Sequence, residues 1–522
     1  MPELQSFTAN GPWVFDPEAT AWSRAVPALR SSARDRVPRW THRSVLPPWR
    51  RIVRTTAALG GAAATWAATD RRRGRSASRT GLSRRLRRSF VYLGPTYIKL
   101  GQIISSAEGL LPEELVTEFK VLRDRVPAES FDDVRKVIEA ELGMPLDRAF
   151  SRFDAIPVAA ASIAQVHLAT LTTGEQVAVK VQRPGIERLV ERDIKIMAWM
   201  APLLAARIDA LKILNLPALI EVFAETIVEE LDFRLEAGNM VDIATVLDAT
   251  GHAAIVVPRP HPRLVTKRVL VMERLEGFSF DDVAGMHAAD VDTGAVVRAL
   301  MVALLEGALI YGVFHGDLHG GNLLVRDDGR IALLDYGITG RLDEDRRGVF
   351  LKMMLSSMAG DHRAVLRGYQ DLGALPREAD LDQFLEEIPV DRPLVDPATA
   401  DADQMLFEMR RVTKALVAHG LRLPKEVVLF MKDFMFIDAA IATLAPDLDI
   451  LAELTYISAY FATTHGETIS RQLGIDSAAV SFDSASLLTS VGMDPDAQVL
   501  THREVRQQRA DARDLLHERR QH

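Results

Sequence analysis

The clearest signal of the fold is the sequence His315-Gly-Asp-Leu-His-Gly-Gly-Asn322, followed by Asp335-Tyr-Gly337. Asp317 and Asn322 are five positions apart, and Asp335 follows them after a short, mostly apolar segment. An aspartate such as Asp317 can orient or deprotonate an attacking hydroxyl, and the oxygens of Asn322 and Asp335 are the hard ligands that Mg²⁺ prefers. Each piece alone is common, but together at this spacing they predict a site for metal-assisted phosphoryl transfer.

Two apolar runs, residues 323–325 and 331–334, separate the two motifs and predict a hairpin that turns at residues 327–329. This order of loop, hairpin and Asp-aromatic-Gly is the catalytic-loop and metal-loop layout of protein kinases. Gly337 permits the backbone turn that lets Asp335 face the metal. We therefore expect a kinase-like fold that uses ATP and Mg²⁺.

A second motif, Val177-Ala-Val-Lys-Val181, is an apolar strand interrupted by Lys180. A lysine at this place, upstream of the catalytic loop, is typical of the phosphate-pairing lysine of kinases. Because Lys180 interrupts an apolar run, it needs a charged partner inside the fold. Glu236, in the acidic stretch 229–236, is the candidate. The alternative is that these acidic residues form a solvated helix face.

An alanine-rich loop stands where a conventional kinase has a glycine-rich one. Alanine adopts positive φ less readily than glycine, so this loop is expected to cradle phosphates differently. The residues predicted to contact the nucleotide here are Ala159, Ala160, Ala161, Ser162, Ile163, Ala164, Gln165 and Val166. Lys180, together with Glu273 and Leu275 at the end of a predicted strand, completes the nucleotide-binding set.

These loops and strands resemble, in the same order, the motifs of the UbiB/ADCK atypical kinase family. Two further motifs fit: Lys99-Leu-Gly-Gln102 resembles the family's KxGQ motif, and Glu230-Leu-Asp232 resembles its ExD motif. The family's helix-C glutamate then falls on Glu236. The resemblance runs from about Phe90 to about Leu454.

The resemblance implies that the KxGQ helices cover the active site, where a protein substrate would otherwise bind, and that Lys99 meets Glu230 or Asp232. Members of the family look more like ATPases or small-molecule kinases than protein kinases, and many support isoprenoid quinone biosynthesis at a membrane. Leu318 and Gly320 replace the two prolines of the family's usual catalytic loop, which is expected to loosen it. The predicted catalytic set is Asp317, Lys180, Glu236, Lys99, Gln102, Glu230 and Asp232, and the predicted metal ligands are Asn322 and Asp335.

Short strand signals followed by long helical stretches predict an α+β, bilobal protein-kinase-like fold with a helical KxGQ extension and a mostly helical C-lobe. Strands are expected at residues 162–171, 176–182 and 263–273, and helices at 130–141, 186–213, 218–247 and 291–311. The expected domains are a loosely ordered arm (1–89), the KxGQ extension (90–130), the N-lobe (131–275), the C-lobe (276–470) and a polar tail (471–522).

The charge of the 522 residues is uneven, although the chain as a whole carries only -8. Up to Phe90 there are 18 arginines and 5 acidic residues, which leaves the remainder strongly acidic. A basic arm on an acidic body suggests an anionic partner, either a membrane surface or, less favoured, a nucleic acid. The alternative is a solvated tail. The chain has no cysteine, so thiol chemistry is excluded.

No signal peptide and no spanning helix are expected from the sequence, and no membrane hairpin near its end. The nearest candidate is the Ala-rich segment 55–69 between arginine clusters, which could lie on a membrane surface without crossing it. We expect a cytoplasmic protein, with peripheral contact with the inner face of the membrane as one alternative.

The lead hypothesis is an Mg²⁺-dependent, ATP-binding atypical kinase or ATPase that acts on, or is stimulated by, a lipid or small molecule, with a link to quinone metabolism as one option. A protein kinase is one alternative, which the missing glycine-rich loop argues against. A non-catalytic nucleotide-binding scaffold is the other, which the intact Asp317, Asn322 and Asp335 argue against.

Overall fold

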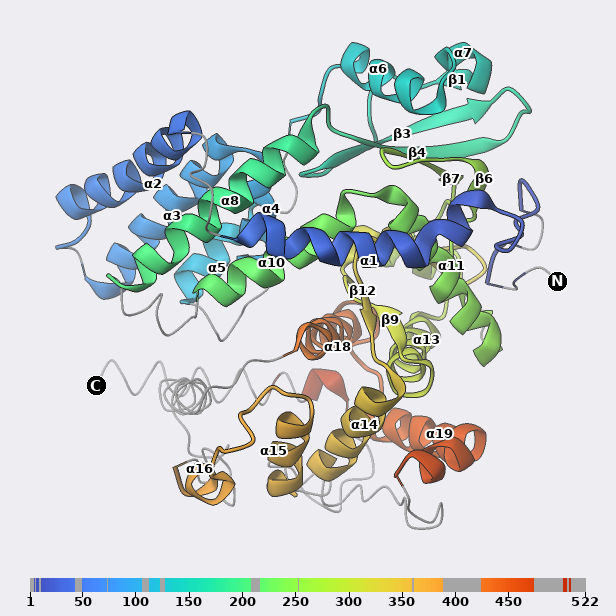
Figure 1. Cartoon of the computed structure of the whole chain (residues 1–522). Coiled ribbons are helices and arrows are strands. Elements are labelled where there is room, and N and C mark those ends of the chain that lie inside the picture. The colour runs from blue at the N-terminus through green and yellow to red at the C-terminus, as the bar shows by residue number, and fades with distance from the viewer. Residues whose placement is uncertain are drawn as a thin grey trace. The chain divides into compact units, whose positions relative to one another are not determined.

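The computed structural model places the Lys180 strand in one unit of the chain and the catalytic loop in another (Figure 1). Unit 1 comprises Met1–Val241, Pro258–Leu275 and Tyr336–Ile338, and unit 2 comprises Asp242–Val257, Glu276–Asp335 and Thr339–His522. The residues that the structure describes are 4, 6–8, 11–42, 49–72, 74–105, 112–122, 127–207, 216–251, 253–358, 361–387, 424–473, 501–504 and 507. The predicted tail after residue 473 lies almost wholly outside them.

A six-stranded antiparallel sheet organises unit 1. Its order is β1 (Phe150–Phe153), β3 (Ala164–Leu171), β4 (Gln176–Gln182), β7 (Val269–Glu273) and β6 (Pro260–Val265), with β2 (Ala159–Ala160) pairing with β3. A hairpin joins β3 and β4, the two strands expected at 162–171 and 176–182, and Gly174 supplies its positive φ of 107°. Lys180 stands opposite Val166 on one side and Leu270 on the other, so it occupies a central strand.

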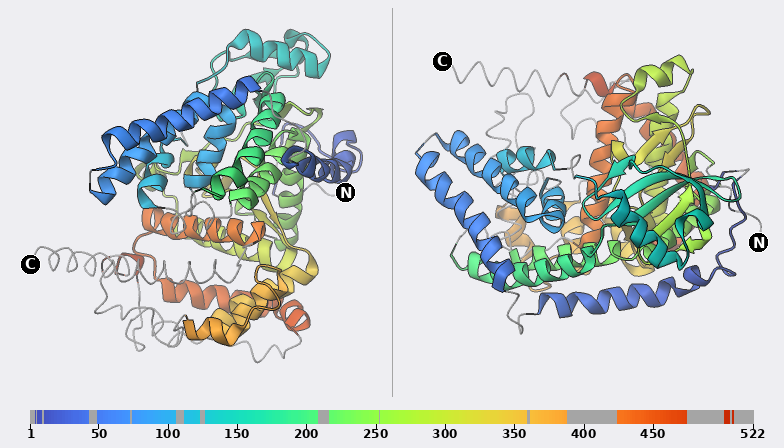
Figure 2. Two further views of the ribbon diagram at one scale, coloured as in Figure 1. Left: turned by 60° about the vertical axis from the view of Figure 1, so that its left-hand side comes forward. Right: turned by 90° about the horizontal axis from the view of Figure 1, so that it is seen from above.

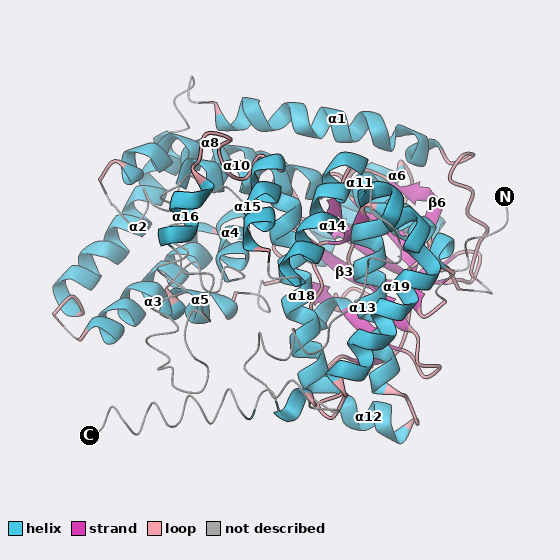
Figure 3. Cartoon of the chain, turned by 90° about the horizontal axis from the view of Figure 1, so that it is seen from below, coloured by secondary structure: helices cyan, strands magenta, loops and turns pink. Residues whose placement is uncertain are grey.

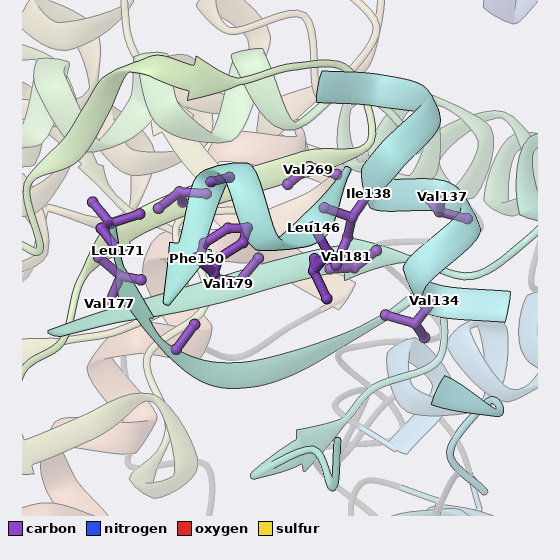
Figure 4. Packing of buried hydrophobic residues seen from close by; sticks show 13 residues of the cluster. Val134, Val137, Ile138, Leu146, Phe150, Leu171, Val177, Val179, Val181 and Val269 are labelled. Carbon is purple, nitrogen blue, oxygen red and sulfur yellow. The ribbon is translucent and has the colours of Figure 1, made fainter. Parts of the chain in front are cut away.

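The hydrophobic core of this sheet is built by alternation along its strands. Val177, Val179 and Val181 of β4 face α6 (Phe131–Leu142) and α7 (Leu146–Ala149), which cover this face (Figure 4). Ser130 caps α6, because its side chain accepts a hydrogen bond from the Asp133 N–H. Since side chains alternate along a strand, Lys180 points to the opposite face of the sheet.

The other regular elements described in unit 1 are helices. They are α1 (Ala21–Thr41), α2 (Trp49–Thr69), α3 (Arg75–Leu93), α4 (Pro95–Ser105), α5 (Glu113–Lys120), α8 (Ile186–Ala205) and α10 (Leu216–Glu230), and α11 (Phe233–Thr250) starts here and continues into unit 2. Figure 2 shows α1 running beside α8 and α10, and α2 packed against α3.

The prediction of a loosely ordered segment up to residue 89 is wrong, because α1, α2 and α3 are long helices. The sequence misled because α1 contains Pro27 and Pro38. An apolar stripe that includes Trp22, Val37 and Trp40 nevertheless buries α1 against its neighbours, and such burial outweighs the local cost of proline.

Unit 2 has a four-stranded sheet in the order β5 (Ile255–Val256), β11 (Ile331–Leu333), β10 (Leu323–Val325) and β8 (Phe278–Ser279), and a two-stranded sheet of β9 (Val313–His315) and β12 (Thr339–Arg341). The predicted β10–β11 hairpin is confirmed. The helices are α12 (Val283–Ala288), α13 (Thr293–Glu306) with a π-helical turn (Gly307–Tyr311), α14 (Glu344–Met358), α15 (His362–Asp371), α16 (Leu381–Glu387), α18 (Lys425–Leu444) and α19 (Ile450–Leu473). Figure 3 shows how far helices predominate, and the predicted α+β class is confirmed.

Two predicted elements have different boundaries. The single helix expected at 218–247 is broken at Leu231 and Asp232 into α10 and α11. The strand expected at 263–273 is the hairpin of β6 and β7, since Thr266 accepts hydrogen bonds from the backbone of Arg268 and Val269 and closes a turn.

By length and composition alone, one described helix, Thr293–Tyr311, could cross a membrane. The sequence analysis took 55–69 as the nearest candidate for a membrane span, but the helix that meets the criteria is Thr293–Tyr311. Of the apolar window in Thr293–Tyr311, 61% is buried inside the protein, as expected for a core helix, so the evidence for a span is weak.

Candidate nucleotide and metal site

Lys180 and Glu236 form a buried ion pair in unit 1. The Lys180 Nζ lies 2.5 Å from the Glu236 Oε1, and the two side chains are only 11% and 4% exposed. Glu236 stands in the first turn of α11, where the helix dipole favours a carboxylate. The ammonium also lies 5.5 Å from the centre of the Phe233 ring. Lys180 is thus paired with Glu236, the partner that the sequence predicts.

The KxGQ helix α4 meets the ExD acids. The Lys99 Nζ lies 2.6 Å from the Glu230 Oε1, and both side chains are largely buried. Asp232 is instead held by both guanidinium ends of Arg234, at 2.9 and 2.7 Å. The amide of Gln102 donates to the Leu122 carbonyl at 3.2 Å. The sequence allowed either Glu230 or Asp232 as the partner of Lys99, and in the structure the partner is Glu230.

The alanine-rich loop is a tight turn between β2 and β3. Its ends are joined by a hydrogen bond from the Ala161 N–H to the Ala164 carbonyl at 2.8 Å. The buried guanidinium of Arg183 donates twice to the Ala161 carbonyl, at 3.1 and 3.0 Å, and also to the Glu129 carboxylate and the Pro127 carbonyl. Arg183 thus ties the turn to the linker before α6, a role that the sequence analysis did not identify.

Gln165 and His167 fix the base of the same turn. The Gln165 Oε1 accepts from the Glu129 N–H, and its amide nitrogen lies 2.8 Å from the His167 Nε2. The His167 Nδ1 lies 2.8 Å from the Asp154 carbonyl and must donate to it, so Nε2 is the acceptor. Burial lowers the pKa of His167, which keeps this neutral tautomer in place. Gln165 therefore supports the turn from inside the lobe.

Glu273 and Leu275 lie at and just beyond the end of β7. The Glu273 carboxylate accepts from the Arg259 N–H at 3.3 Å and from the Thr8 hydroxyl. The Glu273 side chain is therefore engaged with the N-terminal segment, and a nucleotide would have to use backbone groups of residues 273–275.

The catalytic loop of unit 2 is fixed by its own side chains. The His315 Nε2 lies 2.6 Å from the Asp335 carbonyl and donates to it, while its Nδ1 accepts from the Asp317 N–H. The Asn322 amide nitrogen donates to the Asp317 carbonyl at 3.1 Å. Burial lowers the pKa of His315, so it stays neutral. One histidine thus links the loop of Asp317 to the strand end that carries Asp335.

The donor set fits Mg²⁺, although among the described residues no group of three His, Cys, Asp or Glu could hold a metal by itself. The amide nitrogen of Asn322 faces the loop, which leaves its oxygen for a metal, and Asp335 adds a carboxylate. Mg²⁺ is usually held by one or two such oxygens together with substrate phosphates and water. Asn322 and Asp335 would therefore hold a metal that arrives with a nucleotide.

Two residues of α18 that the sequence analysis missed also contact this loop. Lys432 forms an ion pair with the Asp317 carboxylate, and the fully buried Asp433 accepts from the Leu318 N–H at 2.9 Å. Their signal in the sequence is the one used for Lys180, since two adjacent charges interrupt the apolar residues of α18.

Comparisons with known proteins place the chain in a family. Residues 121–368 match the model of the ABC1 atypical kinase-like domain. The uncharacterized protein Rv0647c of Mycobacterium tuberculosis (strain H37Rv) is 38% identical over 391 residues, covering 72% of this chain and 77% of that protein. The chain belongs to the UbiB/ADCK family of ABC1 atypical kinase-like proteins.

Other members of this family are similar over most of the chain. The "Probable protein kinase UbiB" of Marinobacter nauticus is 31% identical, with 70% of this chain and 67% of that protein covered. The chloroplastic protein ACTIVITY OF BC1 COMPLEX KINASE 1 of Arabidopsis thaliana is 30% identical, with 72% and 54% covered. The family resemblance and the kinase-like fold inferred from the motifs are therefore confirmed.

Proposed function

We propose that this UbiB-family protein is an Mg²⁺-dependent ATPase or small-molecule kinase. The observation that carries the proposal is the presence of two residue sets, the buried Lys180–Glu236 ion pair of unit 1 and the fixed Asp317, Asn322 and Asp335 of unit 2. In phosphoryl transfer, a lysine of the first kind pairs with the nucleotide phosphates, and residues of the second kind hold the metal and orient the acceptor. The chemistry needs both sets.

The roles of the residues follow from their chemistry. Lys180, kept in place by Glu236, would neutralise the α- and β-phosphates, and Asn322 and Asp335 would hold the Mg²⁺, which neutralises charge on the β- and γ-phosphates. Asp317 would accept the hydrogen bond of an attacking hydroxyl or water. The turn of Ala159 to Val166 would cover the phosphates.

A small acceptor is favoured over a protein acceptor. Lys99 and Glu230 fasten α4 within unit 1 through an ion pair that is largely buried, which supports the covering role that the family resemblance implies for the KxGQ helix. In addition, the alanine-rich turn is held by Arg183 and lacks the glycines of conventional kinases. Both features support hydrolysis of ATP or phosphorylation of a lipid or small molecule.

The test is ADP release with Mg²⁺-ATP, measured for the wild type and for Asp317→Asn, with and without lipids and phenols. Turnover that depends on Asp317 and rises with a lipid or phenol supports the proposal. Incorporation of labelled phosphate into a protein at a comparable rate would favour the protein-kinase alternative. Nucleotide binding with equal, negligible ADP release from both proteins would make the chain a scaffold.

A peripheral membrane contact is also proposed, on the evidence of one exposed patch on α2 and the end of α3. Trp49, Val53 and Tyr92 are 69%, 57% and 60% exposed. The guanidinium groups of Arg50 and Arg54 lie 5.5 and 4.6 Å from the Trp49 and Tyr92 ring centres. Aromatic rings beside basic groups suit the interface of an anionic bilayer. Arg51 does not contribute, since it binds Asp193.

Liposome co-sedimentation tests this contact. Replacing Trp49 and Tyr92 by Ser should reduce binding to anionic vesicles, and replacing Arg50 and Arg54 by Gln should reduce it most at low salt. The control replaces two exposed arginines of α1, Arg34 and Arg39, by Gln. An equal loss in the control, or no binding by the wild type, would end the membrane proposal and leave the ATP proposal untouched.

A further inference from the structure

The helix α18 presents two consecutive charged residues to the catalytic loop, and they lie in different environments. Asp433 is fully buried, and its carboxylate holds the Leu318 N–H at 2.9 Å. Burial raises the pKa of Asp433 well above its ordinary range. Asp433 is thus a support beneath the loop. Lys432, the next residue, reaches the Asp317 carboxylate.

The Lys432–Asp317 pair is partly open to solvent. The Lys432 and Asp317 side chains are 26% and 23% exposed, in contrast to the buried Asp433. Solvent screens an ion pair with this exposure, so the pair adds less to stability than a fully buried pair would. A contribution to stability is therefore a weak explanation for the contact between the Lys432 ammonium and Asp317, the carboxylate that is expected to meet the acceptor.

Phosphoryl transfer does give a reason. Charge spreads over the oxygens of the transferred group, and a cation supplied at that point accelerates the reaction. The loop from His315 to Asn322 contains no lysine or arginine, so a permanent cation has to come from another element. Lys432 of α18 brings a permanent positive charge to Asp317.

We propose that Lys432 is a further catalytic residue, which binds Asp317 in the resting state and contacts the transferred phosphoryl oxygens in the transition state. In this step the bond between the γ-phosphorus and the β,γ-bridging oxygen breaks, and a bond forms to the oxygen of the acceptor or of water. The acceptor's proton passes to Asp317, ADP leaves, and Lys432 remains an ammonium. The inference rests on the proposed ATP chemistry and adds a residue to it.

The test compares Lys432→Met with Lys432→Arg, and uses Lys352→Met on the exposed side of α14 as the matched control. In ADP release, Lys432→Met should lower kcat by about 10²–10³-fold, as expected for loss of one transition-state contact. KM for ATP should change little, because the contact is made in the transition state. Lys432→Arg should recover part of kcat, since it restores a cation.

Binding of a transition-state analogue separates a catalytic from a structural role. Wild type should bind Mg²⁺-ADP with aluminium fluoride more tightly than Mg²⁺-ADP, and Lys432→Met should lose that gain while keeping its affinity for Mg²⁺-ADP. Equal losses of both affinities would mean that Lys432 only supports the fold, and an unchanged kcat in Lys432→Met would overturn the inference directly.

Two further outcomes are decisive. If Lys432→Met does not fold, Lys432→Gln and Lys432→Arg replace it, and wild-type kcat in both would overturn the inference. Combining Lys432→Met with Asp317→Asn should cost less than the product of the two single effects, because the residues act together. A wild type that neither binds nor turns over Mg²⁺-ATP would overturn the proposed function and this inference together, whereas a fully active Lys432→Met would overturn the inference alone.

Discussion

The Lys180–Glu236 pair gives the sharpest test of how unit 1 is built. Both side chains are largely buried, so Lys180→Met would leave the Glu236 carboxylate in the interior without its cation. Breaking a buried pair on one side typically costs 3–5 kcal/mol. The lower end applies here, because the Lys180 side chain keeps some contact with solvent. We expect Lys180→Met to reduce the free energy of unfolding by about 3 kcal/mol.

Removing both charges should recover most of this loss. In Lys180→Met with Glu236→Met, two apolar side chains of similar size replace the pair, and such replacements are often neutral or stabilising. The control is Lys195→Met, which breaks the half-buried (i, i+4) pair with Glu191 and should cost about 0–1 kcal/mol. The assay is urea unfolding followed by circular dichroism. The reasoning fails if Lys180→Met costs no more than the control, or if the double variant is as unstable as the sum of the singles.

The same variants separate stability from nucleotide binding. A ligand at 100 times its Kd stabilises a folded protein by about 2.7 kcal/mol. The wild type should gain this with Mg²⁺-ATP, and the double variant should be folded but gain nothing. A double variant that keeps the full gain would show that Lys180 does not touch the phosphates.

Four further predictions follow. Asp335→Asn, which removes the charge that would hold the metal, should abolish most of the thermal stabilisation by Mg²⁺-ATP but not that by metal-free nucleotide, and an unchanged shift would reject the metal role. Ala161→Gly should loosen the alanine-rich turn, changing the ratio of ATP to ADP affinity and raising autophosphorylation, and unchanged values of both would contradict it. A double-mutant cycle between Lys99 and Glu230 should give a coupling of about 0.5–3 kcal/mol, since the two groups are 2.6 Å apart, and additive effects would contradict the contact. Burial lowers the pKa of His261 to about 4 in the folded protein, whereas in the unfolded chain the imidazole binds a proton near pH 6.5. The free energy of unfolding should therefore fall as the pH drops from about 6.5 toward 4, and it should fall less in His261→Phe. Equal decreases in both proteins would contradict this assignment.

The motifs that carry the proposed chemistry could be predicted from the sequence because the residues of each motif are close together in the chain. The spacing of Asp317 and Asn322, the strand around Lys180 and the hairpin of β10 and β11 depend on residues close together in the chain, so their patterns predict both structure and chemistry. Glu236 was found by a different argument, since a charge in an apolar strand requires a partner.

The helices before Phe90 could not be predicted from the sequence pattern. Their prolines and arginines look like those of a disordered segment, whereas the apolar stripe of α1 packs against α8 and α10, which are distant in the sequence. The same holds for Arg183, whose guanidinium is satisfied by carbonyls and a carboxylate that lie more than 20 positions away in the chain.

The family, the α+β class and the residue types of the proposed phosphoryl-transfer site could be predicted from the sequence, because spacing and periodicity are properties of neighbouring residues. The pairing of charges could not be predicted in this way and is seen in the folded chain: Lys99 with Glu230 rather than Asp232, Arg234 with Asp232, and Lys432 with Asp317. The last of these pairs joins residues 115 positions apart. A pattern along the chain cannot rank such partners, because they are selected by how helices pack and by the free-energy cost of leaving a charge buried without its counter-ion.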